Sequence, residues 1–194
     1  LWFPYPHMAV AERKPPTATE TFGDFSKIDP LMEDFMKATE GHSVLLTFST
    51  IPTWMFESDK PVAYPEDPNQ VFWAYNPGVK FRDTTFKQLT DYFVRLFQWY
   101  TKGGFTDELG KFRRSGYHYK IPYWEVLNEP DLEHHFTPES YTRLYDAMVT
   151  ALKPVSPETK FVGLGLAYET NPEWFTYFLN PAHHRKDVRL EGIS

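Results

Sequence analysis

The sequence predicts an α/β protein in which helices cross over between the strands of a parallel sheet. Strand-like and helix-like segments alternate along the 194 residues, with connections of the length that such crossovers need. A chain of this length can bury the core of one ordinary domain. Doubly wound sheets and (β/α)8 barrels share this alternation, so a second set of observations must separate them.

Two observations favour the (β/α)8 barrel, or TIM barrel. No glycine-rich phosphate turn follows any predicted strand, which removes the commonest reason for a dinucleotide-binding fold. The long loops follow strands, after Ile51 and after Leu127, on the face where barrel enzymes place their chemistry. The chain supplies about four complete strand–helix units, whereas a barrel takes about 250 residues. We therefore expect residues 1–194 to be an incomplete part of one catalytic barrel domain.

The first half of the chain supplies the first predicted strands and helices. Residues 1–6 resemble the end of a strand that enters a loop. A helix begins near Asp29 and Pro30, and the apolar run 43–49 predicts a buried strand. The stretch 57–83 is irregular and rich in proline and aromatics. A second helix ends at Gly103 and has one apolar face. That face consists of Phe86, Leu89, Phe93, Leu96, Phe97 and Tyr100.

The second half continues the alternation. Residues 123–127 predict a strand, and Thr137 and Pro138 open a helix that Pro154 closes. Residues 160–166 predict the next strand, followed by a helix that begins at Asn171 and Pro172. Residues 188–194 predict a last strand.

Composition excludes several classes of protein. The net charge is −6 and no stripe of lysine or arginine is visible, so we expect neither a nucleic-acid nor a membrane partner. Absence of cysteine excludes disulfides, thiolate metal sites and a cysteine nucleophile. Because the first residues lack both an initiator methionine and a signal-peptide pattern, and the last lie in a predicted strand, we expect a piece of a longer polypeptide. The remainder of that polypeptide would complete the barrel.

The candidate catalytic residues lie in the segment 123–131, where the predicted strand is followed by Asn128, Glu129 and Pro130. Proline ends the strand and turns the chain, so Glu129 would project from the carboxyl end of the sheet toward a substrate. Burial among aromatics would raise the pKa of this carboxyl group, as a general acid near neutral pH requires. Asn128 beside it is suited to bind a sugar hydroxyl, notably the 2-hydroxyl.

Residues 124–131, Trp-Glu-Val-Leu-Asn-Glu-Pro-Asp, resemble the fourth-strand signature of the large clan of retaining (β/α)8 glycosidases. The chain is most similar to glycoside hydrolase family 39, the β-xylosidase/α-L-iduronidase family. Residues 49–55 resemble the end of that clan's third strand, and residues 188–194 the start of its sixth. The resemblance therefore covers most of this chain, from about the end of strand two to the start of strand six.

This resemblance implies roles for three residues and places the nucleophile elsewhere. Glu129 matches the general acid/base, Asn128 its sugar-binding neighbour, and Glu125 an inward-facing acid below them. The family's nucleophile, a second glutamate at the end of strand seven, would lie beyond Ser194. Leu127 departs from the pattern, since relatives often have tryptophan there. The family uses no cofactor, and its members favour an extracellular or secreted location.

Aromatic residues offer further contacts with a sugar ring. Trp54 follows a strand and is either a stacking platform or a core residue. Trp73 belongs to the long loop, where an aromatic side chain either contacts substrate or holds the loop in place. The same alternatives apply to Tyr64, Phe72 and Tyr75 of that loop, and to Trp2, Tyr5 and His7, which follow the presumed second strand of the barrel.

Other polar clusters have less specific patterns. His134-His135 and His183-His184 lack the spacing of a metal site, so we interpret them, with Asp131 and Glu133, as solvated surface and expect no metal. Asp107-Glu108 lies between a helix and a strand, on the far face of a barrel, and is rejected as a nucleophile.

The sequence thus predicts a retaining O-glycosidase acting on a carbohydrate, with Glu129 as general acid/base. Two alternatives stay open: a carbohydrate-binding barrel without catalysis, and an isolated interaction domain with no active site.

Overall fold

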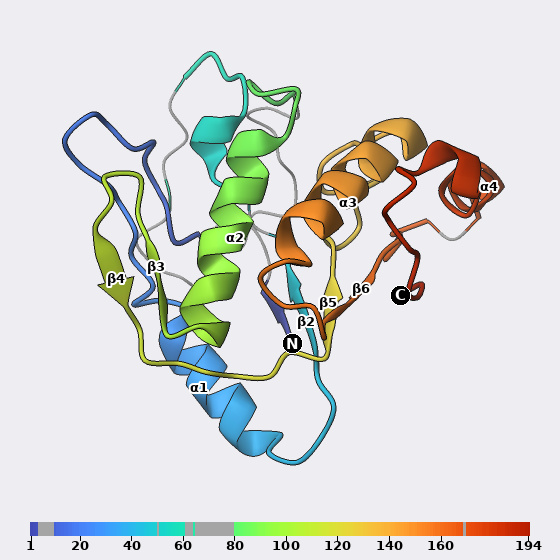
Figure 1. Ribbon diagram of the computed structural model, residues 1–194. Helices are drawn as coiled ribbons and strands as arrows, with labels where there is room; N and C mark the ends of the chain where they lie inside the picture. The colour runs from blue at the N-terminus through green and yellow to red at the C-terminus, as the bar shows by residue number, and fades with distance from the viewer. Residues whose placement is uncertain (4–9, 50, 61–63, 65–79, 169) are drawn as a thin grey trace.

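A four-stranded parallel sheet forms the centre of the molecule in the computed structural model, which describes residues 1–3, 10–49, 51–60, 64, 80–168 and 170–194 (Figure 1). Its strands are β1 (Trp2–Phe3), β2 (Leu45–Phe48), β5 (Tyr123–Glu125) and β6 (Lys160–Val162). Their order in the sheet, β1-β2-β5-β6, is their order in the chain, and every pair is parallel. The predicted α/β class is confirmed.

One face of this sheet is apolar because alternate side chains of a strand point to the same side. Phe48 stacks on Phe3 and on Trp124, and Trp124 in turn contacts Phe97 of the second long helix. The opposite face carries polar groups, since register pairs Thr47 with Glu125. The helices therefore pack on one face and leave the other for polar side chains.

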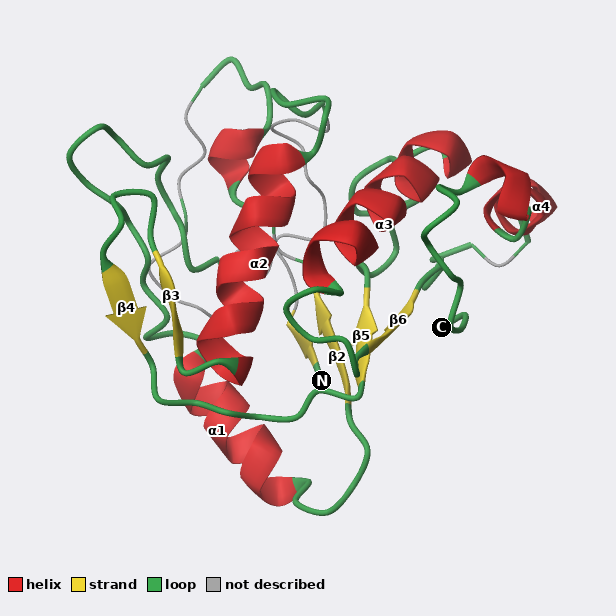
Figure 2. Ribbon diagram, in the orientation of Figure 1, coloured by secondary structure: helices red, strands yellow, loops and turns green. Residues whose placement is uncertain are grey.

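Among the described residues, four α-helices accompany the sheet: α1 (Asp29–Ala38), α2 (Lys87–Thr101), α3 (Pro138–Leu152) and α4 (Pro172–Phe178) (Figure 2). Two short 3₁₀ helices are η1 (Thr53–Met55) and η2 (Pro181–His183). The predicted start of α3 is confirmed, because the Thr137 hydroxyl accepts from the Ser140 amide while Ser140 returns a bond to the Thr137 amide. The Asn171 side chain likewise accepts from the Glu173 amide at the start of α4.

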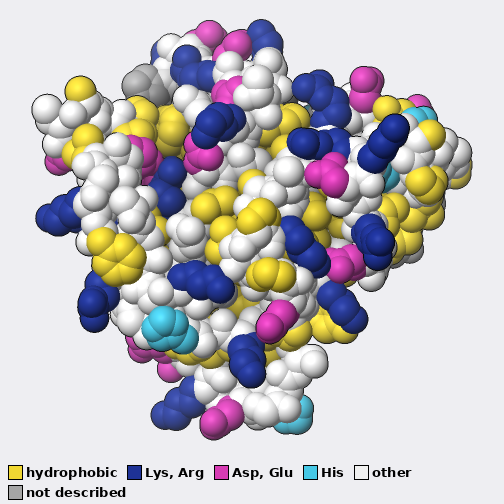
Figure 3. All heavy atoms as spheres, in the orientation of Figure 1, with side chains coloured by type: hydrophobic (Ala, Val, Ile, Leu, Met, Phe, Trp, Pro, Cys, Tyr) yellow, Lys and Arg dark blue, Asp and Glu magenta, His cyan; other side chains and the backbone are white. Residues whose placement is uncertain are grey.

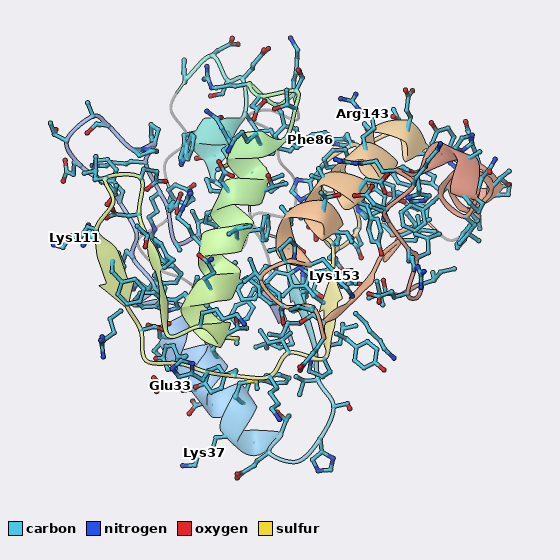
Figure 4. All side chains as sticks on the ribbon, in the orientation of Figure 1. Glu33, Lys37, Phe86, Lys111, Arg143 and Lys153 are labelled. Atoms are coloured by element: carbon cyan, nitrogen blue, oxygen red, sulfur yellow. The ribbon has the colours of Figure 1, made fainter. Side chains whose placement is uncertain are left out.

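Helices α2 and α3 lie side by side over the apolar face (Figures 1 and 4). Near the start of α2, the Arg143 guanidinium of α3 lies 5.8 Å from the centre of the Phe86 ring. Near the end of α3, the Lys153 ammonium donates to the Thr159 carbonyl at 2.9 Å and to the Glu191 carboxylate at 3.1 Å. Basic and acidic side chains are interspersed on the face seen in Figure 3.

The structure differs from expectation in two segments. A two-stranded antiparallel hairpin, β3 (Gly104–Thr106) with β4 (Phe112–Arg114), follows α2 and was not predicted. The strand predicted at residues 188–194 is reduced to one parallel bridge between Gly163 and Ile193. The strands predicted at 43–49, 123–127 and 160–166 are present but shorter.

The sheet is open within the described residues, with β1 at one edge and the Gly163–Ile193 bridge beyond β6 at the other. The structure therefore has an open α/β sheet with crossover helices, and the predicted closed barrel stays a prediction. In the part of the chain that is described, no helix combines the length and apolarity needed to cross a membrane.

Candidate active site

The end of β5 is shaped by an irregular backbone. The Val126 amide still pairs with the Val162 carbonyl at 3.0 Å, and the Val126 carbonyl accepts from the buried Tyr141 hydroxyl at 2.8 Å. Regular pairing stops there, because Leu127 has a φ of 62° and Glu129 a φ of 41°. Positive φ in non-glycine residues is unfavourable by about 1–3 kcal/mol and gathers at functional sites. This conformation buries the Leu127 side chain and leaves Glu129 half-buried.

Hydrogen bonds of both the backbone amide and the backbone carbonyl of Glu129 fix its position. Its amide donates to the Gly165 carbonyl at 2.6 Å, which ties it to the segment after β6. Its carbonyl accepts from the amides of Leu132 at 3.0 Å and Glu133 at 2.8 Å. Pro130 suits the start of this single turn, since it lacks the amide hydrogen that the first position would leave unpaired. The predicted placement of Glu129 at the carboxyl end of a strand is therefore what the structure has.

Asp131 joins the same turn to the loop that follows β6. Its two carboxylate oxygens accept from the amides of Ala167 at 2.9 Å and Tyr168 at 3.1 Å. Two adjacent amides on one carboxylate form a fixed, charge-assisted contact. The sequence interpretation of Asp131 as solvated surface is wrong, because this side chain fixes the loop beside Glu129.

Asn128 belongs to a polar cluster drawn from three strand ends. Its backbone amide donates to the Ser49 hydroxyl at 3.2 Å, and the Trp2 indole donates to that same hydroxyl at 2.8 Å. Its side-chain Nδ2 donates to Glu133 Oε1 at 3.1 Å. The structure therefore brings Trp2, Ser49 and Asn128 together beside Glu129, with Glu133 beneath them.

Glu133 is the buried carboxyl group of this region, and the sequence pattern did not reveal it. Only 5% of the residue is exposed. Burial, together with the charges of Glu129 and Glu125, raises the pKa of Glu133 to about 8 against the opposing hydrogen bonds from the Asn128 and Ser49 side chains. The signal available in the sequence was the spacing of four residues from Glu129, one turn beyond Pro130.

His134 is also buried, with 1% of the residue exposed, so its interpretation as solvated surface is wrong. Its Nε2 lies 3.1 Å from the Ser49 carbonyl, to which it donates. Burial lowers the pKa of His134 to about 3, so the ring is neutral at pH 7. His135 is exposed, as predicted.

Glu125 lies on the polar face of the sheet below Glu129, with 7% of the residue exposed. Its Oε2 accepts from the Thr47 hydroxyl at 2.5 Å. Its Oε1 lies beside Gly165. A Cβ atom added at Gly165 would lie only 2.7 Å from this oxygen. The pairing of Thr47 with Glu125 places the Glu125 side chain on the polar face of the sheet. Contact of Glu125 with a sugar stays a prediction.

Trp54 does not join the cluster around Asn128. It lies in η1, half-buried, and its indole donates to the Glu12 carbonyl at 2.9 Å. It lines a cavity of about 650 Å³ together with residues 13–15, 58–60, 82, 83 and 88 and Thr53. Trp54 is therefore packed at one edge and borders open space, and its contact with a sugar ring stays a prediction. Trp73, the other aromatic candidate, lies outside the described residues.

The remaining polar clusters have structural partners. Asp107 is buried at the hairpin turn, where it accepts from the amides of Leu109 and Lys111 and from Arg113. His183 is exposed, but the His184 side chain is only 3% exposed and lies 2.6 Å from Asp146, so its interpretation as solvated surface is wrong. Among the described residues, no three histidine, aspartate or glutamate side chains are grouped to hold a metal ion.

The fold and the strand-end carboxylate define an α/β protein whose sheet matches part of known glycosidase structures. A glucosidase from Croceicoccus marinus superimposes with a TM-score of 0.51 at 18% identity, covering 80% of this chain and 27% of that one. An endo-β1,6-glucanase superimposes with a TM-score of 0.54 at 16% identity, covering 87% and 34%. This chain thus spans about a third or less of their length. No protein-family model and no curated protein matches the sequence.

Proposed function

We propose that this chain is the central part of a (β/α)8 glycoside hydrolase that cleaves O-glycosidic bonds with retention, and that Glu129 is its general acid/base. The observation that carries this is Glu129 at the carboxyl end of a central parallel strand, in a sheet similar to part of two glycosidases. The chain-order sheet with helices packed on its apolar face also supports a barrel over a doubly wound sheet. The finer assignment to glycoside hydrolase family 39 rests on residues 124–131.

In the proposed reaction, Glu129 donates its proton to the glycosidic oxygen while a carboxylate attacks the anomeric carbon. The bond to the leaving group breaks as the glycosyl–enzyme ester forms. Glu129, now ionised, then takes a proton from water, whose oxygen displaces the ester and releases the sugar. Retention requires the two carboxyl groups to lie about 5–5.5 Å apart. The nucleophile would be a glutamate of the full-length polypeptide beyond Ser194.

Asn128 is proposed to bind the sugar 2-hydroxyl, a contact that strengthens as positive charge develops at the anomeric centre. Its backbone is fixed by Ser49, and it directly precedes Glu129. Glu125, Trp54 and Trp73 are proposed as further substrate contacts, with Glu125 deepest on the polar face.

The test is hydrolysis of a panel of aryl glycosides by the full-length polypeptide. Glu129→Gln should lower kcat/KM on the preferred glycoside by about 10²–10⁴-fold, since general acid–base catalysis contributes that much. Glu139→Gln, on the exposed first turn of α3, is the matched control and should leave kcat/KM unchanged. Unchanged activity in Glu129→Gln would end the assignment. Sugar binding without hydrolysis in the parent would instead favour a carbohydrate-binding barrel.

A further inference from the structure

Glu133 is a buried acid next to the proposed sugar-binding residue, and the proposed reaction gives it no role. Its Oε1 accepts from Asn128 Nδ2 at 3.1 Å. Its Oε2 is buried, and the Ser49 side chain also stabilises the ionised form of this carboxyl group. The turn after Pro130 brings this carboxyl group back beneath Asn128, because the Glu133 amide bonds to the Glu129 carbonyl at 2.8 Å.

No cation stabilises the charged form of Glu133 in the described part of the chain. The nearby basic group is His134, whose Nε2 lies 3.8 Å from Glu133 Oε2 and donates to the Ser49 carbonyl. Burial disfavours charge on both side chains, raising the pKa of Glu133 and lowering that of His134. At pH 7 Glu133 is therefore a neutral acid whose carbonyl oxygen is suited to accept the Asn128 amide hydrogen.

A side-chain amide has one donating and one accepting end. With Nδ2 of Asn128 engaged by Glu133, its Oδ1 points away from Glu133. The backbone amide of Asn128 is held at the same time by Ser49, which the Trp2 indole also contacts. Although Nδ2 keeps a second hydrogen, this orientation leaves Oδ1 to accept a hydrogen bond from a hydroxyl group.

We propose that Glu133 is a positioning residue that turns the Asn128 amide so that Oδ1 accepts a hydrogen bond from the sugar 2-hydroxyl. This rests on the proposed function and deepens it, since it specifies which atom of Asn128 contacts the sugar and what holds it. Glu133 itself touches no reacting atom.

The experiment compares the 4-nitrophenyl glycoside that the full-length polypeptide cleaves best with its 2-deoxy analogue. Glu133→Met keeps the approximate volume but removes the acceptor, and should lower the preference for the 2-hydroxylated substrate about tenfold, the value of one hydrogen bond. Glu133→Gln is isosteric with the neutral acid and keeps the acceptor, so it should retain the preference. Glu133→Asp keeps the carboxyl group but is one methylene shorter, so it should also lower the preference for the 2-hydroxylated substrate. It replaces Glu133→Met in the comparison if Glu133→Met does not fold.

If Glu133 only filled space, Glu133→Gln and Glu133→Met should have similar substrate preferences. A preference retained in Glu133→Gln and lost in Glu133→Met therefore indicates a positioning role. A folded Glu133→Met with unchanged preference would overturn the proposal, and so would a Glu133→Gln as impaired as Glu133→Met. Failure of the proposed function is distinguishable from both. In that case Glu129→Gln would be fully active, or the parent would neither bind nor cleave any glycoside, and the Glu133 proposal would fall with it.

Discussion

Gly165, in the segment after β6, contacts both Glu125 and Glu129. Its carbonyl accepts from the Glu129 amide, and its missing side chain leaves space for Glu125 Oε1. A Cβ there would lie 2.7 Å from that oxygen, which is closer than nonbonded atoms tolerate. A larger residue at this position would therefore displace the Glu125 carboxylate from its place beside the strand end.

Gly165→Ala should lower the free energy of unfolding by about 1–3 kcal/mol and also lower kcat/KM, because either Glu125 or the Glu129 turn must move. Gly23→Ala is the matched control, since its Cβ would meet only the Phe25 and Phe105 rings at an ordinary 3.7 Å. Urea unfolding and steady-state kinetics check both variants. Equal stability of the two variants would contradict the packing described for Gly165.

The buried acid Glu133 makes stability depend on pH. Its folded-state pKa of about 8 lies above its ordinary 4.5, so its contribution is present below about pH 4.5 and is lost as the pH rises through about 8. Glu133→Gln cannot ionise. It should match the parent near pH 4 and be up to about 4 kcal/mol more stable near pH 9. Thermal melts across this range measure it, and parallel curves for the two proteins would contradict it.

At the scale of elements, α3 is linked to the segment after η2 by His184 and Asp146. His184 Nδ1 lies 2.6 Å from Asp146 Oδ1, and its Nε2 lies 2.6 Å from the Phe178 carbonyl. Burial alone would lower the pKa of His184, but the hydrogen bonds to Asp146 and Phe178 and the Asp146 charge outweigh it, so the pKa is raised. Both ring nitrogens face acceptors, as the charged imidazolium requires.

The stability from this link should therefore be complete below the ordinary histidine pKa of about 6.5 and be lost as the pH rises through the raised value. Asp146→Asn should lower the free energy of unfolding by about 2–4 kcal/mol near pH 6 and by less near pH 9. His183→Ala, on the exposed neighbour, should change little at either pH. An equal loss for Asp146→Asn at both pH values would contradict the charged link.

Periodicity predicted α1, α2, α3 and α4 because each buries a repeated apolar face. The β3–β4 hairpin was missed because its strands have three residues each and its turn depends on one side chain, Asp107, collecting backbone amides. Residues 188–194 were predicted as a strand from local composition. Strand pairing depends on neighbours in space, and only Ile193 finds one among the described residues.

The site was predictable where it depends on chain order, and not where it depends on a turn. Glu129 and Asn128 follow a strand, and the carboxyl ends of parallel strands share one edge, so their placement could be predicted. Glu133 and His134 were interpreted as surface because composition cannot show that the turn after Pro130 folds them inward. Trp54 was left undecided, and its partner Glu12 lies 42 residues away in the chain.

For the whole molecule, the open sheet makes a prediction about association. Trp2 and Leu45 are exposed by 38% and 37% on the strands at and near one edge. Unpaired parallel edges and apolar surface promote association. Residues 1–194 expressed alone should therefore bind a hydrophobic dye and elute as multimers, whereas the full-length polypeptide should elute as a defined species. A cooperative, soluble monomer of residues 1–194 would contradict the proposal that further strands complete the sheet.

The central claim is that Glu129 transfers the proton in a retaining glycosidase, and leaving-group dependence with azide tests it most directly. Glu129→Gln of the full-length polypeptide should lose far more activity on a glycoside with a poor leaving group than on a dinitrophenyl glycoside, which needs no proton. Azide should restore turnover on the activated substrate and yield a glycosyl azide of unchanged anomeric configuration, as NMR can read. Equal loss on both substrates, with no azide product, would contradict the claim.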